Sequence, residues 1–322
     1  MVTELVGGHG EFTQVIAPAF AAHGQPPPTY VPRLQDAIEA ARAVCERPAA
    51  VIYTPNSEHA AQVMACIAAD LDVFVERPFA TPAHDAPRLV AAARDADVLF
   101  FTGVQRRLEA SFRYLREVVG TRRGFGELAS IRCTLAVGMR PTGWRLDPGL
   151  CHGGVVIDSG YHLLDCAAWL AEAGGAEITG STTGFVELAV DPWAPGPLET
   201  SAVGSLVGPT GVRLTFDLSY SAPVSSVFER LECRDAEGAC VVVTRDQTLK
   251  SDRPGLVTHQ QADGTVILDH VRLPGTPRQA APLIGFLRSR DERASAQEHP
   301  CSARHSLTTW QLTKEIYDHA HR

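Results

Sequence analysis

The chain contains the stretch Gly153-Gly154-Val155-Val156-Ile157-Asp158-Ser159-Gly160-Tyr161-His162-Leu163-Leu164-Asp165, around which the rest of the sequence is organised. Its apolar residues predict the opening of a helix that continues to about Glu172. On such a helix Asp158, His162 and Asp165 share one face. This carboxylate–imidazole–carboxylate stripe needs partners, because a buried charge is costly unless it is paired or hydrogen-bonded. The stripe is either a structural cluster at a helix start or part of a functional site.

The composition is that of a globular chain. Its 322 residues suit one large or two ordinary domains, and 45% apolar and 20% charged content is ordinary for such proteins. The net charge of −8 gives no support for nucleic-acid binding, which calls for a basic footprint. We see neither an apolar run of about 20 residues that would span a membrane nor a secretory signal. We therefore expect a cytoplasmic protein whose partners include neither nucleic acid nor a membrane.

The eight cysteines are scattered along the chain and include no C-x-x-C pair. This pattern indicates reduced, mostly packed thiols. It predicts neither a disulfide framework nor a metal site.

The first half of the chain alternates short apolar strands with helices. Strands are predicted at residues 2–6, 29–31, 49–55, 72–76 and 98–103, and helices at 11–22, 34–44, 58–69, from 81 onward and at 110–119. Short strands separated by helices of ten to fifteen residues are typical of βαβ units. The fold expected for residues 1–125 is therefore a Rossmann-like, doubly wound parallel sheet of the α/β class.

After residue 126 the pattern changes to strands and turns around the central helix. Strands are predicted at residues 128–137, 203–207, 212–220, 228–233, 240–244 and 266–273, and late helices at 280–290 and 302–321. We expect residues 126–322 to form an α+β domain with an open, mostly antiparallel sheet.

A glycine-rich turn, Gly7-Gly8-His9-Gly10, follows the first predicted strand. It invites comparison with a phosphate-binding loop. The pattern G-x-G-x-x-G does not fit, because Thr13 stands where the last glycine should fall. We therefore interpret it as a plain turn between a strand and a helix.

Five short motifs, in this order, resemble those of the glucose–fructose oxidoreductase/inositol dehydrogenase (Gfo/Idh/MocA) family. They are Thr54-Pro55-Asn56 with His59, Glu76-Arg77-Pro78, Gly103-Val104-Gln105-Arg106-Arg107, Gly143-Trp144-Arg145 and the stretch 153–165. The resemblance implies an N-terminal Rossmann domain for NAD or NADP. It also implies a C-terminal domain whose open sheet serves substrate binding and homo-oligomer contacts. The substrates implied are sugars, polyols or related keto compounds.

The resemblance also assigns roles to individual residues. The catalytic group comprises His162, Asp158 and Arg77, with Arg77 standing where the family has lysine. The cofactor-binding residues implied are Thr54, Pro55, Asn56, His59, Glu76, Gln105, Trp144 and Arg145, and the substrate-binding residues are Tyr161 and Asp165. An imidazole ordinarily titrates near neutral pH, and general acid–base catalysis contributes on the order of 10²–10⁴-fold.

Arg77 is the first departure from the family pattern. A guanidinium stays protonated, so it can hold a carboxylate or polarise a carbonyl but cannot exchange a proton. The two lysines, Lys250 and Lys314, lie in unrelated segments. Acid–base chemistry would therefore pass to His162 or to Tyr161. The alternative role for Arg77 is a structural ion pair.

The second departure is at the N-terminus, where one βα unit of the family is missing. In the preferred alignment, residues 2–6 are the family's second strand and residues 11–23 its second helix. The first strand, the glycine-rich turn and the first helix are then absent. In the alternative alignment, Gly7–Gly10 is a degenerate first turn and the second unit is deleted. The chain could also start at an internal methionine of a longer protein.

Three functional hypotheses follow. The first is an NAD(P)-dependent oxidoreductase acting on a sugar-like or polyol substrate. The second is an isomerase, lyase or cyclase that uses the same pocket without a dinucleotide, and the third is a non-catalytic family member.

Overall fold

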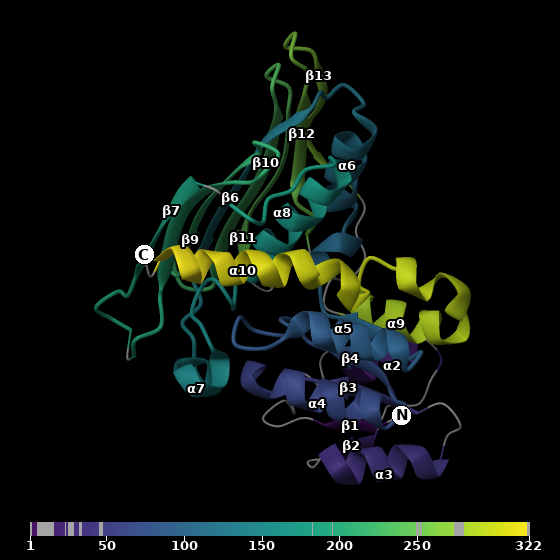
Figure 1. The fold of residues 1–322 in the computed structure, drawn as a ribbon. Helices are drawn as coiled ribbons and strands as arrows, with labels where there is room; N and C mark the ends of the chain where they lie inside the picture. Colours follow the sequence, from purple (N-terminus) through teal and green to yellow (C-terminus); the bar gives the residue numbers. More distant parts are fainter. Residues whose placement is uncertain are drawn as a thin grey trace. The chain divides into compact units, whose positions relative to one another are not determined.

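A computed structural model describes residues 2–4, 16–22, 24, 29–31, 34–44, 48–181, 183–194, 196–248, 251, 253–273 and 280–320 (Figure 1). The chain forms two compact units. The first contains Met1–Gln105 and Pro277–Trp310, and the second contains Arg106–Thr276 and Gln311–Arg322. The sequence predicted a single division after residue 125. The structure instead groups residues 106–125 with the second unit and returns a late segment to the first.

The first unit is built on a five-stranded parallel sheet with the order β2-β1-β3-β4-β5. Its strands are β1 (Val2–Glu4), β2 (Thr29–Val31), β3 (Ala49–Ile52), β4 (Asp72–Val75) and β5 (Phe100–Thr102). Its helices are α2 (Ala17–Ala22), α3 (Leu34–Val44), α4 (Asn56–Ala68), α5 (Ala86–Asp95) and α9 (Ala281–Asp291), with short 3-10 helices η4 (Arg293–Glu298) and η5 (Ala303–Ser306). Strands β3 and β4 are buried throughout, as expected for apolar runs covered on both faces.

The C-terminal segment returns to this sheet through α9. The ring of Phe286 lies 5.9 Å from that of Phe74 and 5.5 Å from that of Phe101. The buried carboxylate of Asp72 accepts hydrogen bonds from Arg290 at 3.0 Å and Arg293 at 2.7 Å. These contacts explain why a segment remote in sequence belongs to the first unit.

The strand order bears on the two N-terminal alignments. Strand β1 pairs in parallel with β2 on one side and with β3 on the other, so it occupies the interior of the sheet and leaves no gap. The order 2-1-3-4-5 is a common doubly wound arrangement in which the first strand lies at the reversal of strand order. Deleting either the first or the second strand from the Rossmann order 3-2-1-4-5-6 leaves this same order, so the topology is compatible with both alignments. Gly7–Gly10 itself lies outside the described residues.

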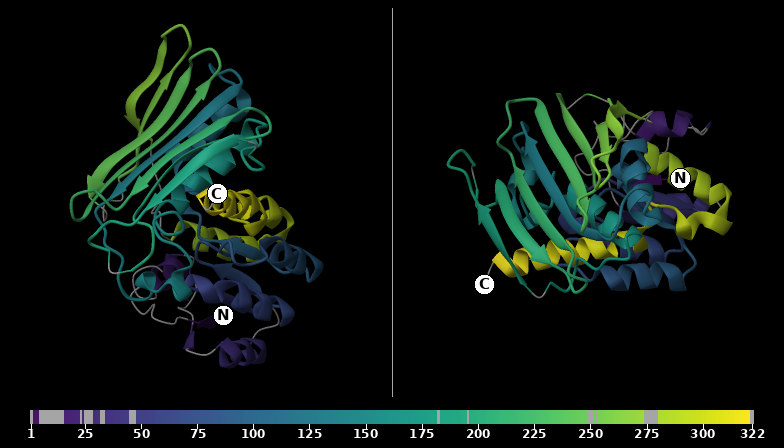
Figure 2. Two further views of the ribbon diagram at one scale, coloured as in Figure 1. Left: turned by 60° about the vertical axis from the view of Figure 1, so that its left-hand side comes forward. Right: turned by 90° about the horizontal axis from the view of Figure 1, so that it is seen from above.

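The second unit is built on an eight-stranded sheet with the order β13-β12-β11-β10-β6-β9-β8-β7 (Figure 2). Its strands are β6 (Leu128–Val137), β7 (Thr183–Ala189), β8 (Ser201–Val207), β9 (Arg213–Ser219), β10 (Ser226–Asp235), β11 (Cys240–Thr248), β12 (Leu256–Gln260) and β13 (Val266–Arg272). All neighbouring pairs are antiparallel except β6 and β9. The predicted fold class, a Rossmann-like sheet followed by a mostly antiparallel one, is confirmed.

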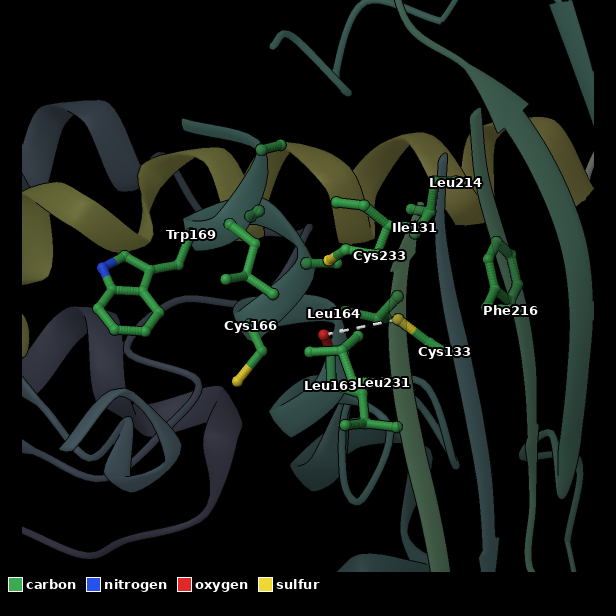
Figure 3. Packing of buried hydrophobic residues seen from close by; sticks show 14 of the residues in the cluster. Ile131, Cys133, Leu163, Leu164, Cys166, Trp169, Leu214, Phe216, Leu231 and Cys233 are labelled. Atoms are coloured by element: carbon green, nitrogen blue, oxygen red, sulfur yellow. Dashed lines mark hydrogen bonds between the residues drawn. The ribbon is translucent and has the colours of Figure 1, made fainter. Parts of the chain in front are cut away.

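Helices cover one face of this sheet. They are α6 (Ala110–Thr121), α8 (Tyr161–Ala173) and, from α10 (Leu307–Ala320), its C-terminal part. The smaller helical elements are η2 (Gln105–Leu108), η3 (Gly143–Leu146) and α7 (Pro148–Cys151). Figure 3 shows Leu163 and Leu164 of α8 beside sheet residues such as Leu231. The thiol of Cys133 on β6 donates to the carbonyl of Leu163 at 3.7 Å. This packing fixes α8, which carries the central motif, against the sheet.

The cysteines of the described residues are all free thiols, and every one except the partly exposed Cys240 is buried. Among the described residues there is no cluster of three or more side chains able to hold a metal ion. Within the same residues, no helix has the length and apolar character needed to cross a membrane.

Candidate active site

Three motif segments of the first unit lie at the carboxyl end of its parallel sheet. We call this end of the sheet, with the three segments, the motif edge. Thr54-Pro55-Asn56 follows β3, Glu76-Arg77-Pro78 follows β4 and Gly103-Val104-Gln105 follows β5. Because these strands are parallel neighbours, their carboxyl ends lie together. The backbone joins the segments further, since Glu76 N donates to Ile52 O at 2.9 Å and Gly103 N to Val75 O at 3.1 Å.

The position of this edge is that of a ligand site in open α/β sheets. The chain turns to one side after β1 and to the other side after β2, so the strand order reverses between β1 and β3. Ligands of such sheets bind outside the carboxyl ends of the strands at this reversal. Residues 54–56 begin the connection from β3 to α4 at that point.

His59 ties two of the three segments together. Its buried ring lies with Nδ1 at 2.8 Å from the carbonyl oxygen of Pro78 and Nε2 at 2.9 Å from that of Thr54. Burial lowers the pKa of His59 to about 4. Both ring nitrogens are thus engaged with the backbone. These contacts support a role in holding the two turns, rather than the direct cofactor contact expected from the sequence.

Glu76 and Arg77 are partly exposed at this edge. Arg77 Nε lies 3.5 Å from Glu76 Oε1, and their side chains are 15% and 30% exposed, respectively. A Cβ at Gly103 would collide with Glu76 Oε2, so the absence of a side chain at Gly103 makes room for that carboxylate. Thr54 and Asn56 are buried, and Gln105 is half-buried at the start of η2. The groups that are partly exposed here are therefore the Glu76 carboxylate, the Arg77 guanidinium and the Gln105 amide.

In the second unit, the central motif differs from its predicted conformation. Helix α8 begins at Tyr161, so Asp158 lies in the preceding turn and not on the helix. His162 and Asp165 do lie on α8. The prediction that all three residues share one helical face was therefore wrong. The reason is that the backbone before α8 is bound by a distant residue, Glu199, as described below.

Asp158 is held by side chains from two other segments. Tyr220, just after β9, donates from its hydroxyl to Asp158 Oδ2 at 2.8 Å. Arg145 Nε lies 3.5 Å from Asp158 Oδ1, and its guanidinium lies 4.4 Å from the ring centre of Trp144. Burial and the neighbouring Asp158 carboxylate raise the pKa of Tyr220 well above its usual range. No local sequence pattern identifies Tyr220 as a partner of Asp158, because the contact joins positions 62 residues apart.

Asp165 has a different environment from Asp158. Arg107 donates from Nε to Asp165 Oδ2 at 2.8 Å and from Nη2 to Oδ1 at 2.6 Å. The two side chains are 0% and 2% exposed, respectively. This two-pronged buried pair supports a structural role for Asp165 rather than the predicted contact with substrate. Tyr161 is also fully buried, whereas His162 is partly exposed in the first turn of α8.

The fold and the motif edge define a Rossmann-type α/β protein with an added α+β unit. Sequence profiles agree. Residues 7–104 match the profile described as an oxidoreductase family with an NAD-binding Rossmann fold, and residues 112–241 match the profile of the Gfo/Idh/MocA C-terminal domain. Together these matches cover more than two thirds of the chain. The chain belongs to the Gfo/Idh/MocA oxidoreductase family, as the order of its motifs predicted.

Two curated relatives resemble parts of the chain. A 1,5-anhydro-D-fructose reductase of Ensifer adhaerens is 33% identical over 131 residues, which are 40% of this chain and 39% of the relative. A myo-inositol 2-dehydrogenase of Thermotoga maritima is 28% identical over 122 residues, or 38% of this chain and 35% of the relative. The matched regions thus span well under half of either relative.

A solved structure matches the chain more widely. The aldose-aldose oxidoreductase of Caulobacter crescentus, crystallised with glycerol, gives a TM-score of 0.74 at 18% identity. The match covers 99% of this chain and 88% of that protein. At this identity the likeness concerns the fold.

Proposed function

We propose that the chain is an NAD(P)-dependent oxidoreductase acting on a sugar, a polyol or a related keto compound. The observation that carries this proposal is the motif edge of the first unit. Three motif segments follow the carboxyl ends of β3, β4 and β5, and the first of them lies where the strand order reverses, in a chain whose family has an NAD-binding Rossmann fold. The names of the two curated relatives support a substrate with several hydroxyl groups.

The residues of this edge fit a dinucleotide. Glu76 supplies acceptors for ribose hydroxyls, and the amides of Asn56 and Gln105 can both donate and accept, as a carboxamide requires. Thr54 and Pro55 shape the turn on which Asn56 lies, and His59 fixes that turn. When bound, the nicotinamide ring accepts or supplies the hydride.

The second unit supplies the groups proposed for substrate binding and proton transfer. We assign proton exchange at the substrate oxygen to His162, whose partly exposed imidazole can both donate and accept. Asp158, held by Tyr220 and Arg145, accepts a hydrogen bond from a substrate hydroxyl. Arg77 contributes a fixed positive charge that polarises but does not exchange a proton. Trp144 supports Arg145 by stacking, which we prefer to the cofactor contact expected from its motif.

We further propose a cytoplasmic homo-oligomer that associates through the sheet of the second unit. Large apolar side chains are exposed on three of its strands, β7, β8 and β13, with Phe185 of β7 58% and Val203 of β8 42% exposed. Light scattering on the purified chain tests this association. The expected result is a mass at least twice that of one chain, and a Phe185→Asp variant should lower it.

Titration of the purified chain with NADH and NADPH, followed by nicotinamide fluorescence, tests the proposed activity. Saturable binding of one of them is expected, with turnover of polyols or ketoses in the parent. A His162→Ala variant should retain binding and lose turnover. A matched His270→Ala variant, which removes an exposed imidazole of β13, should retain both. Absence of binding of either dinucleotide would sink the proposal and return the dinucleotide-independent hypothesis.

A further inference from the structure

Glu199 lies in the second unit, just before β8, and its side chain is enclosed. It is 7% exposed, and Oε1 accepts from three donors: Gly154 N at 2.8 Å, Val156 N at 3.3 Å and the Tyr317 hydroxyl at 2.6 Å. The Glu199 backbone carbonyl accepts from Val155 N at 2.9 Å. One residue therefore binds three successive backbone N–H groups of the central motif.

The two glycines of the motif allow this close approach. A Cβ at Gly154 would collide with the carbonyl oxygen of Glu199, and a Cβ at Gly153 would collide with the Tyr317 hydroxyl. Gly153 also has φ +154°, a conformation that L side chains rarely adopt. The glycines of the 153–165 stretch are thus explained by what packs on them.

The segment bound by Glu199 leads directly to the proposed active-site groups. Asp158 N donates to Gly154 O at 2.9 Å, and Gly160 N donates to Val155 O at 2.7 Å. The turn formed by these bonds ends at Tyr161, the first residue of α8, and His162 is the second residue of that helix. The position of Asp158 and the start of α8 therefore depend on the same anchored backbone.

We propose that Glu199, fixed by Tyr317 of α10, is a positioning residue that sets Asp158 and His162 for the reaction. This inference rests on the proposed function. Without the carboxylate, three backbone or hydroxyl donors in a buried site would lose their acceptor. The turn would relax, and a displacement of about 1 Å in a catalytic group can cost on the order of 100-fold in rate.

Burial raises the pKa of Glu199, while its three hydrogen-bond donors act in the opposite direction. An uncharged glutamine in its place still offers a carbonyl oxygen to the same donors. The conservative Glu199→Gln variant should therefore keep the turn, whereas Glu199→Ala should not. Tyr317→Phe removes one donor alone and leaves the carboxylate with its two backbone donors, Gly154 N and Val156 N.

The test compares these variants with Tyr114→Phe, which also removes a partly buried hydroxyl hydrogen bond from the second unit, there to His259 Nδ1 at 2.9 Å. For Tyr317→Phe we expect kcat about 10-fold lower, for Glu199→Ala about 100-fold lower and for Glu199→Gln within about 3-fold of the parent. The NADH dissociation constant should be unchanged throughout, and Tyr114→Phe should turn over like the parent. Equal turnover in Tyr317→Phe and Tyr114→Phe would overturn the positioning role.

Hydrogen exchange measured by mass spectrometry tests the same role without catalysis. In Tyr317→Phe, faster exchange should be confined to peptides covering residues 153–165, compared with Tyr114→Phe. Unchanged exchange there would overturn the proposal even if the parent proves inactive. A further outcome is that the parent is inactive and binds neither NADH nor NADPH, while Tyr317→Phe still shows faster exchange in residues 153–165. That result would refute the proposed function and leave the anchoring of this turn established.

Discussion

Replacing Asp165 by asparagine should destabilise the second unit severely. The substitution deprives the fully buried Arg107 guanidinium of the Asp165 carboxylate. Removing one member of a buried pair costs about 3–5 kcal/mol, because the remaining charge stays buried without compensation. Whole domains are stable by only about 5–15 kcal/mol, so this is a large fraction of the total.

Urea unfolding followed by tryptophan fluorescence measures this effect, since the Trp169 ring lies 5.9 Å from the Arg107 guanidinium. Asp318→Asn is the matched control, because it breaks the half-exposed pair with Lys314 on the same unit and should cost at most about 1 kcal/mol. A double variant, Arg107→Met with Asp165→Leu, should recover most of the loss, since apolar replacements of buried pairs are often neutral or stabilising.

The reasoning would be refuted if Asp165→Asn unfolded at the same urea concentration as Asp318→Asn. If the variant then showed a raised KM for substrate, Asp165 would be the substrate ligand expected from the sequence. Recovery of folding without recovery of activity in the double variant would assign both roles to Asp165.

Three further predictions concern the first unit. Below about pH 6.5 an unfolded His59 takes up a proton that the folded residue, with its pKa lowered to about 4, refuses, so the unfolding free energy should fall by about 3 kcal/mol by pH 4. The urea midpoint should fall less between pH 7 and pH 4 in His59→Gln than in the parent. A rise of the parent's midpoint on acidification would contradict this and would mean that a charged ring donates to both carbonyls. Arg77→Lys restores an exchangeable proton and should alter the pH–rate profile, whereas Arg88→Lys should not. Gly103→Ala should displace the flexible Glu76 carboxylate and weaken NADH binding several-fold, with little change in melting temperature; unchanged NADH affinity would contradict the proposed role of Glu76.

The parallel sheet could be predicted because its strands are short apolar runs with clear ends. Strands β3 and β4 are bounded by Pro55 and Pro78, and the helices between them have ordinary apolar spacing. Strands β7 and β12 were missed. Strand β7 lies at the sheet edge with its residues mostly exposed, so it lacks the buried alternation from which strands are recognised.

The candidate site was predictable only as far as local motifs extend. The segments after β3, β4 and β5 could be identified from their short sequence motifs alone. The contacts that shape the second unit join distant positions: Glu199 binds Gly154 45 residues away, and Tyr317 binds Glu199 across 118 residues. Helical spacing therefore suggested a helix through Asp158, while tertiary hydrogen bonds hold that segment as a turn.

Arg77 makes this anchored turn more important than it would be in a chain with the family's lysine. A guanidinium stays protonated at working pH, so it holds charge in place but does not relay a proton. Within the 153–165 stretch, His162 is the residue whose side chain ordinarily titrates near neutrality. In the proposed reaction no second exchanger compensates if His162 is displaced. The rate should then depend steeply on the backbone that Glu199 and Tyr317 hold, even though neither side chain touches the substrate in this proposal.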